Sequence, residues 1–445
     1  MEERVLERWF KLTEVGTDVK TEVIAGVTTF MTMAYIIVVQ PTVLMAAGMD
    51  FGAVLVATCL SSALATILMA FFANYPIALA PAMGHNFFFT YTVVLGMDVS
   101  WQTALGAVFI SGSLFIFLSF FGLREAVIHV VPESLKHAIA VGIGLLIALV
   151  GLQWSGIVVD APGTLVGLGH LKSPPVLLAL FGLGIMSILL VLGVKGAILW
   201  GIGASTLVGL VSGLVQYHGV VSLPPSLAPT LLQLDIAGAF DLGLVTVIFV
   251  FLLLDLFDTV GTLIGVSQQA GLLKDGRLPR ARGALLADAF GTVGGALLGT
   301  STVTSYVESA AGVAAGGRSG LANLVTAALF LVSLFFYPLV RMVGGGYQAG
   351  GELVLYPVTA PALVVVGSIM VRNVRHIPWE EYTEAIPAFL TMIIMPLTFS
   401  ITEGIAFGFI AFTFLKIVRG QWREVPWLLY LFAALFILRY AALAS

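Results

Sequence analysis

The sequence predicts a helical membrane protein that crosses the bilayer many times. Hydrophobic residues make up 59% of the 445 residues and charged residues only 10%. The mean hydropathy of +1.06 is far above that of a soluble domain. Apolar stretches of about 20 residues, enough to cross the hydrocarbon layer, follow one another along the chain. The lipid bilayer is therefore the expected surroundings of most of the protein.

Hydropathy and turn residues divide the chain into fourteen apolar spans. Seven lie in residues 1–217, seven in residues 242–420, and residues 421–445 form a separate C-terminal segment. The expected spans are residues 23–44, 52–72, 76–95, 103–121, 135–154, 175–192, 198–217, 242–264, 284–298, 302–315, 321–339, 356–371, 385–399 and 404–418. The apolar stretch at residues 427–443 is expected to lie on the membrane face or to pack against it.

The basic residues support this count and give an orientation. With the N-terminus in the cytoplasm, all but three of the 20 basic residues fall in cytoplasmic segments, as the positive-inside rule requires. This set includes Arg4, Arg124, Lys274 and Arg277. Lys172 and Arg341 fall on the opposite side, and Arg439 lies near the C-terminus. The expected location is the cell inner membrane, with a cytoplasmic N-terminus.

Seven spans in each half give the two halves opposite orientations, which defines an inverted repeat. The third span of each half is interrupted. Residues 75–84 contain two prolines and a glycine before a helical run from His85, and residues 299–307 are polar and β-prone before a helix start at Glu308. Broken backbone at membrane depth needs protein or water to satisfy its polar groups. We expect two spans that are half strand and half helix, meeting near the midplane; two ordinary loops are the alternative.

Ionisable side chains within spans are candidate functional groups, because they are costly in lipid. In the eighth span, Asp255, Asp258 and Thr262 share one helical face at spacings of three and four residues. Asp288 in the ninth span is also a candidate; its carboxylate is alternatively expected at the cytoplasmic end or paired with a loop arginine. Burial favours the protonated form of a carboxyl group, so Asp255, Asp258 and Glu308 are the candidate proton carriers.

The third and tenth spans supply further candidates. His85 is either a proton relay or a structural histidine at a helix start, and Asn86 follows it. Glu308 stands at the start of the second broken helix. The threonines of the first span, Thr28, Thr29 and Thr32, are expected to bond preceding helical carbonyls.

Several strings of the chain resemble one transporter family. They are Asp255-Leu-Phe-Asp-Thr-Val-Gly-Thr262, Thr300-Ser-Thr-Val-Thr-Ser-Tyr-Val-Glu-Ser-Ala-Ala-Gly-Val-Ala-Ala-Gly-Gly-Arg-Ser-Gly320, Ile24-Ala-Gly-Val-Thr-Thr-Phe-Met-Thr-Met-Ala-Tyr35 and Ser134-Leu-Lys. Together they resemble the AzgA-like hypoxanthine, guanine and adenine permeases, which belong with the nucleobase-ascorbate transporters. The resemblance covers nearly the whole chain. It implies import of a purine nucleobase by proton symport, without an enzymatic step.

The resemblance also implies an architecture and a site. A core domain of spans 1–4 and 8–11 would move against a gate domain of spans 5–7 and 12–14, often in a homodimer. Asp258 and Glu308 would bind the base, Asn86 would contribute and Asp255 would support them. Met83 would offer a backbone amide. A flat, amide-edged ring also needs an apolar or aromatic wall, for which the chain offers Met83, Tyr306 and Phe87, and the expected set is completed by Thr262 and Ser309.

The chain departs from the family's pattern at one place, and two other functions are alternatives to purine transport. The chain reads Gly84-His-Asn-Phe-Phe-Phe where the family commonly reads Gly-Leu-Asn-Ala-Phe-Phe, which predicts a narrower pocket and leaves the preferred purine undetermined. The rivals are a sulfate-type anion transporter of the same architecture and an intramembrane aspartyl enzyme using two of the three span aspartates. A net charge of −4 argues against nucleic-acid binding. No nucleotide-binding or metalloprotease motif is present, so neither a cofactor nor a metal is expected.

Overall fold

The computed structural model describes residues 7–121, 131–161, 163–240, 242–273, 278–350 and 353–443. Four members of the predicted cytoplasmic basic set, Arg4, Arg124, Lys274 and Arg277, lie outside these ranges. The described chain is mostly helical, and its strands form two-stranded pairs. Within the described ranges, eight helices are long and apolar enough to cross a membrane. The prediction of a helical, multi-pass membrane protein is therefore confirmed.

Each of these eight helices coincides with one predicted span. They are Val19–Met45 (α3 and α4 together), Phe51–Phe72 (α5), Trp101–Phe120 (in α7), Glu133–Trp154 (α9), Pro174–Val191 (α10), Val245–Gln269 (in α12), Gly320–Gly344 (α15 to α16) and Ile401–Val418 (α19). Shorter helices occupy other predicted spans: α11 (Ala197–Val211), α13 (Ala281–Leu298), α17 (Ala360–Met370) and α18 (Tyr382–Thr398). Length and apolar composition alone identify eight crossings, so the count of fourteen and the inverted repeat stay predictions.

Local chemistry explains where helices depart from the predicted spans. The first span divides at Ala34 and Tyr35 into α3 (Val19–Met33) and α4 (Ile36–Met45). The seventh was expected to reach residue 217, but α11 ends at Val211, just before Gly213 adopts a φ of 73° that favours glycine. The eleventh changes from α15 (Gly320–Ser333) through a 3-10 turn to α16 (Tyr337–Gly344), where Pro338 lacks the N–H that a continuous helix needs.

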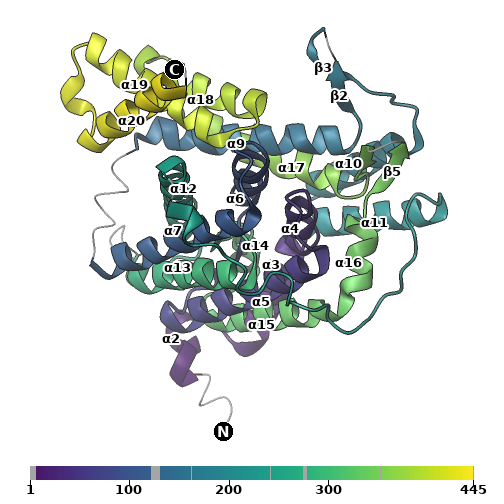
Figure 1. Ribbon diagram of the computed structural model, residues 1–445. Helices are drawn as coiled ribbons and strands as arrows, with labels where there is room; N and C mark the ends of the chain where they lie inside the picture. The colour runs from purple at the N-terminus through teal and green to yellow at the C-terminus, as the bar shows by residue number, and fades with distance from the viewer. Residues whose placement is uncertain are drawn as a thin grey trace.

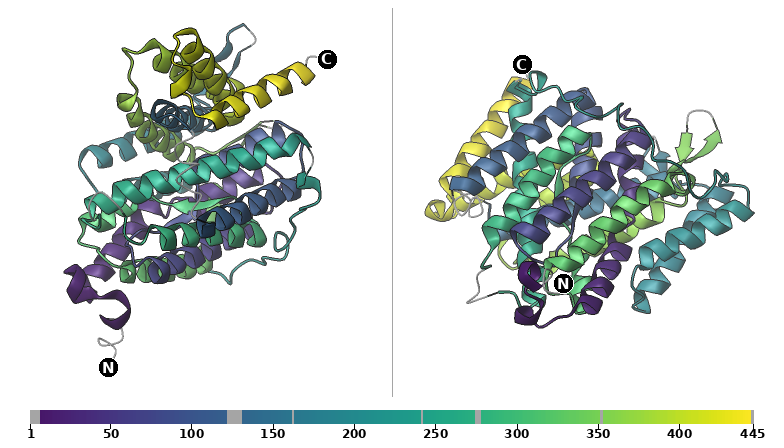
Figure 2. Two further views of the ribbon diagram at one scale, coloured as in Figure 1. Left: turned by 90° about the vertical axis from the view of Figure 1, so that its left-hand side faces the viewer. Right: turned by 90° about the horizontal axis from the view of Figure 1, so that it is seen from below.

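The helices pack in two groups, seen one above the other in Figure 1 and from the side in Figure 2. In the lower group, α5 packs against α4, α13 and α15, while α7 (Trp101–Phe121) packs against α13 and α12 (Leu242–Gln269). In the upper group, α9 packs against α17, α18 and α19, and α10 packs against α11 and α17. The helix α20 (Trp427–Leu443) packs against α19, so the C-terminal apolar stretch is a helix held by the upper group.

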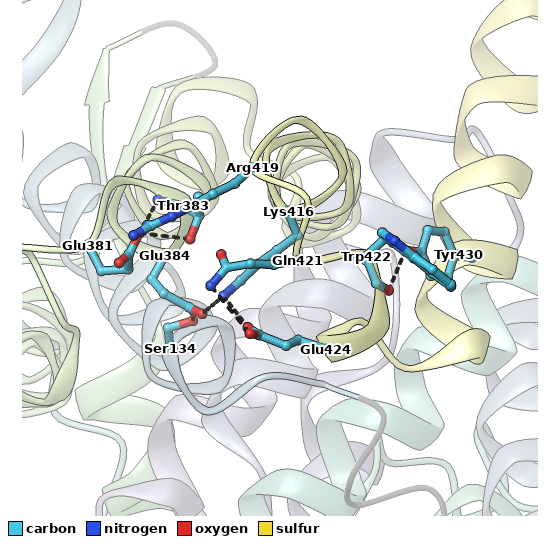
Figure 3. A network of polar contacts seen from close by, with 10 residues as sticks. All are labelled: Ser134, Glu381, Thr383, Glu384, Lys416, Arg419, Gln421, Trp422, Glu424 and Tyr430. Carbon is cyan, nitrogen blue, oxygen red and sulfur yellow. Dashed lines mark hydrogen bonds and ion pairs between the residues drawn. The ribbon is translucent and has the colours of Figure 1, made fainter.

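Charged side chains bind the upper group together at one end (Figure 3). Lys416 on α19 lies 2.9 Å from a carboxylate oxygen of Glu384 on α18 and 3.2 Å from one of Glu424. Ser134 on α9 donates a hydrogen bond to Glu384, and Arg419 pairs with Glu381. Because Lys416 is only 5% exposed, this network ties α9, α18 and α19 together through a largely buried charge.

Two short strands meet in the lower group and form the centre of the fold. β1 (Leu79–Pro81) pairs antiparallel with β4 (Val303–Ser305), with Ala80 opposite Thr304. Bonds from the amide of Ala82 to the carbonyl of Thr302, 2.9 Å, and from the amide of Tyr306 to the carbonyl of Ala78, 2.9 Å, extend the pairing. All strand residues are buried. The predicted meeting of the two interrupted stretches is confirmed, because each strand satisfies the other's backbone groups.

A short helix follows each strand, as predicted. α6 (Met83–Phe87) follows β1 and continues as a π-helix, η1 (Phe88–Leu95), and α14 (Ser309–Ala314) follows β4. The first helix begins two residues before the predicted start at His85. Hydrophobic periodicity over this phenylalanine-rich stretch did not indicate the wider π-helical turn. The other strand pairs, β2 (Val158–Ala161) with β3 (Leu165–Leu168) and β5 (Tyr347–Gly350) with β6 (Leu353–Leu355), lie in connections between predicted spans.

Candidate functional site

Glu308 stands at the N-terminal end of α14, where β4 ends. Its carboxylate accepts a hydrogen bond from the Tyr35 hydroxyl at 2.7 Å, and its backbone carbonyl accepts one from Thr32 Oγ1 at 3.3 Å. Both partners come from the interrupted first span. A Cβ on Gly312 would lie 2.1 Å from Thr29 Oγ1, so only glycine lets α14 pack this closely on α3. The small residue at position 312 therefore brings Glu308 to Tyr35.

Asp258 lies on α12, the helix of the lower group that lies next to the upper group in the side view of Figure 2. Protein surrounds it, yet its side chain is exposed, because open space runs along this helix. The exposed strip continues through Gly261, Gly265 and Gln268 towards the end of α12, and a Cβ on either glycine would meet nothing within 4 Å. The hydroxyl of Thr259, the next residue on α12, lies 2.6 Å from that of Thr304 on β4, and α12 also packs against α14, so both acids lie next to the paired strands.

Asp255 and Asp288 form a second acidic pair behind this region. Both are 0% exposed, and their carboxyl groups are in hydrogen-bonding contact between α12 and α13. Asp288 also accepts a 2.7 Å bond from Thr259 Oγ1. The alternatives of a cytoplasmic end or a loop arginine for Asp288 are therefore wrong, because the carboxyl group is buried against another aspartate.

The predicted residues of the third span are buried, and Asn86 and Phe87 contact other side chains of the protein. The Asn86 amide donates to Gln40 Oε1 at 2.7 Å, while its own carbonyl oxygen has no partner in the described part of the chain. Phe87 is fully buried and stacks on Tyr91 with ring centroids 5.7 Å apart. His85 is 2% exposed, and neither of its ring nitrogens has a hydrogen-bond partner among the described residues. Met83 retains 8% exposure.

The remaining predicted residues support the strand pair. The Tyr306 hydroxyl donates to the carbonyl of Pro81, and the Ser309 hydroxyl accepts a 3.0 Å bond from the amide of Ala78. Both side chains thereby fix one broken span against the other. Thr262 is 8% exposed, one turn beyond Asp258 on α12. Acids and tyrosine hydroxyls thus come together from four segments that are remote in sequence.

Sequence reasoning missed two polar residues at this centre. Tyr35 was not a candidate because a single hydroxyl in an apolar span carries no local signal. Gln40 joins Asn86 to the second broken span by donating to Thr300 Oγ1 at 2.9 Å and Ser301 Oγ at 2.8 Å. A buried glutamine inside an apolar run was the one signal available. The threonine expectation holds for Thr32, whose Oγ1 lies 2.8 Å from the carbonyl oxygen of Thr29 and 3.2 Å from that of Thr28, with the carbonyl oxygen of Glu308 as a third acceptor within reach at 3.3 Å.

A separate cavity of about 410 Å³ lies at the other end of α12. It is lined by Tyr91 and Thr92 of η1, Val247 of α12, and Phe399 and Glu403 next to α18 and α19. With a helical rise of 1.5 Å per residue, Val247 and Asp258 are about 16 Å apart along α12. The cavity therefore does not contain the acidic centre, although it lies between the same two groups of helices.

The fold and this centre define a class of protein, a multi-pass membrane transporter with two strand-and-helix segments around buried acids. The transmembrane domain of a cyanobacterial bicarbonate transporter, BicA, has the same fold: the TM-score is 0.62 at 15% identity, covering 87% of this chain and 97% of the other. The sequence profile of the xanthine and uracil permeases, described as "Permease family", matches residues 20–407. The chain belongs to this family of nucleobase-ascorbate transporters, which are permeases and not enzymes.

Three relatives match almost the whole chain. A putative permease of Methanocaldococcus jannaschii is 53% identical over 99% of both chains. The adenine permease AdeP of Escherichia coli is 46% identical, covering 98% of this chain and 96% of the relative. The guanine/hypoxanthine permease PbuO of Bacillus subtilis is 45% identical, covering 97% of this chain and 99% of the relative. The aspartyl-enzyme interpretation is excluded by family membership, and the Asp255–Asp288 pair is moreover too buried to admit a substrate.

Proposed function

We propose that the protein imports purine nucleobases across the cytoplasmic membrane by proton symport. The substrate class is hypoxanthine, guanine, adenine or xanthine, in keeping with the names of the relatives. The observation that carries the proposal is that Asp258 on α12 and Glu308 at the start of α14 both lie next to the β1–β4 pair. The N-terminus is cytoplasmic in this proposal, and the fourteen spans form two inverted halves.

The acidic centre suits a neutral, flat heterocycle. The N–H groups of a purine edge would donate to carboxylate oxygens of Asp258 and Glu308, while Tyr35 holds the Glu308 carboxylate in place. Tyr306 and Met83, beside the strand pair, would contact the ring face. Phe87 and Asn86 shape the third span from behind, because both are fully buried. A contribution of Asn86 to binding would need the site to open, because its carbonyl oxygen, which has no partner among the described residues, is buried.

Alternating access would come from motion between the two groups of helices. The lower group corresponds to the core domain of spans 1–4 and 8–11, and the upper group to the gate domain. With the N-terminus inside, the exposed strip beyond Asp258 leads to the cytoplasm, and the cavity at Val247 and Phe399 lies on the outer side. Lys136 of α9 sits 5.4 Å from the centre of the Phe257 ring on α12, a contact between the groups that would change as they move.

Transport of radiolabelled hypoxanthine and adenine into proteoliposomes tests the proposal. We expect accumulation driven by an imposed proton gradient and abolished by a protonophore. Asp258→Asn and Glu308→Gln should each lower uptake at least tenfold, since a hydrogen bond to a charged group contributes about 1.5–3 kcal/mol. Asp160→Asn, an exposed change on β2, serves as the matched control. Uptake at the wild-type rate by either site variant would refute the assignment.

A second candidate, an anion transporter, follows from the fold shared with a bicarbonate transporter. Its central site would need a neutral or positive group facing the anion, whereas Glu308 and Asp258 are acids. Uptake of sulfate or bicarbonate, competing with hypoxanthine in the same vesicles, separates the two. We expect no competition and no anion uptake; anion uptake without purine uptake would favour the rival.

A further inference from the structure

The hydrogen-bond partners of Asp255 and Asp288 show that the two carboxyl groups are not equivalent. Asp288 accepts a 2.7 Å bond at Oδ1 from the hydroxyl of Thr259. The Thr304 hydroxyl lies 2.6 Å from that of Thr259 and is placed to donate to it. A hydroxyl has one hydrogen to give, and Thr259 gives its hydrogen to Asp288. Asp288 therefore has a well-placed donor at one oxygen, which favours its ionised form.

Asp255 lacks such a donor. Among the described residues its only hydroxyl neighbour is Thr292, 3.4 Å away, and that hydroxyl also lies 2.8 Å from the carbonyl oxygen of Val303. Because the single hydrogen of Thr292 goes to the nearer carbonyl, neither oxygen of Asp255 receives a good hydrogen bond. Its Oδ1 and the Oδ2 of Asp288 are buried without a donor among the described residues. Two such acids in contact cannot both be ionised, so a proton must lie between them.

Nothing else in the described surroundings neutralises this pair. None of the ion pairs in the described ranges includes either carboxyl group. No group of three or more acidic, histidine or cysteine side chains suited to a metal occurs in the described part of the chain. The other titratable side chains on packed elements are Asp258 on α12, Arg282 on α13 against Phe120, Tyr306 and Glu308 next to α14, Cys59 on α5 and His85 on α6; α7 and β4 have none. Lys136 of α9 lies 5.4 Å from the centre of the Phe257 ring on α12, and it pairs with Glu133 and with neither aspartate.

We propose that the Asp255–Asp288 pair is the binding site of the transported proton, with Asp255 carrying the proton and donating it to Asp288. This inference rests on the proton symport proposed above. It adds the place where the proton is held, which is behind the purine site and not on Asp258 or Glu308, the acids that contact the base. The chemical step is a proton transfer: the O–H bond of Asp255 breaks on release, and the proton leaves to water in the open space beside α12.

The geometry couples this proton to the purine. Asp255 and Asp258 are three residues apart on α12, and the charge of Asp258 acts on both members of the pair. A proton on Asp255 removes a negative charge beside Asp258, which then remains ionised and able to accept the N–H groups of a purine. By linkage, a bound purine favours retention of the proton to the same extent. Release of either ligand then weakens the binding of the other.

Infrared difference spectroscopy and binding calorimetry together test the proposal in purified protein in nanodiscs. The wild type should show the carbonyl band of a protonated carboxyl group at neutral pH, retained in Asp258→Asn and lost in Asp255→Asn, whose amide mimics the protonated acid. In Asp288→Asn the band should remain, but no longer respond to alkaline pH or to added hypoxanthine. Thermal unfolding should be little changed in Asp255→Asn, because an isosteric amide still donates to Asp288.

Calorimetry in buffers of different ionisation enthalpy measures proton uptake on binding. At an alkaline pH at which the infrared band has disappeared from the purine-free protein, wild type should take up about one proton per hypoxanthine, and Asp255→Asn should bind hypoxanthine with none. A band that persists in Asp255→Asn, or proton uptake in that variant equal to wild type, would overturn the assignment. Absence of the band from the wild type would do so as well. Failure of the wild type to bind any purine would instead refute the proposed function, while the infrared band still reports on the pair.

Discussion

Replacing Tyr35 by phenylalanine is expected to weaken purine binding and transport while leaving the protein folded. The ring of Tyr35 is 1% exposed, and phenylalanine fills the same volume. The substitution removes only the 2.7 Å hydrogen bond that the hydroxyl donates to Glu308. The Glu308 carboxylate would then lose the group that holds it at the start of α14, and part of the purine site would become mobile.

The size of the effect follows from the type of bond and its exposure. A hydrogen bond to a charged group contributes about 1.5–3 kcal/mol. Because Glu308 is half-buried, water replaces part of the lost bond. We expect a net loss of about 1–2 kcal/mol, or about five- to thirtyfold in the dissociation constant of hypoxanthine.

A double-mutant cycle shows whether Tyr35 acts through Glu308. Dissociation constants would be measured for wild type, Tyr35→Phe, Glu308→Gln and the double variant, with Tyr217→Phe, a tyrosine 68% exposed, as the control. We expect Tyr35→Phe to have much less effect in the Glu308→Gln background, because the partner is already changed. Equal losses in both backgrounds, or no loss in the wild-type background, would refute the reasoning.

Three further predictions concern packing and charge. Gly312→Ala should lower uptake at least tenfold and cost about 1–3 kcal/mol of stability, because its Cβ would overlap Thr29; wild-type uptake and melting temperature would contradict this. Lys416→Met should destabilise the upper group by roughly 2–3 kcal/mol, since Glu384 loses its buried partner. Adding Glu384→Gln should restore part of the lost stability in thermal unfolding. An unchanged melting temperature in Lys416→Met would show that the network contributes nothing to stability. Cys59, 0% exposed, should react with a maleimide only after unfolding; rapid labelling of the folded protein would contradict the packing of α5.

The strand-and-helix segments could be predicted because their residues violate the rules of a membrane helix. Two prolines before Gly84 and a polar, β-prone run before Glu308 rule out continuous helices, and a membrane interior then requires a partner for the free backbone. The register that puts Ala80 opposite Thr304 could not be predicted. It depends on how α5 and α13 pack around both strands, which no local pattern records.

The acidic side chains were predictable as a set, but not their pairing. Helical spacing placed Asp255 and Asp258 on one face of α12, and the structure separates them: one is buried against Asp288 and the other faces open space. Only the packing of α13 against its neighbours decides this. Tyr35 could not be predicted at all. In the sequence it is an ordinary residue of an apolar span, and the turn that divides α3 from α4 places it next to Glu308.

A cryo-electron microscopy structure in nanodiscs with saturating hypoxanthine tests the central claim most directly. We predict density for the base between Asp258 and Glu308, with its N–H edge on the two carboxylates and its plane beside Tyr306 and Met83. Density confined to the cavity at Val247 and Phe399, with the acidic centre empty, would contradict it.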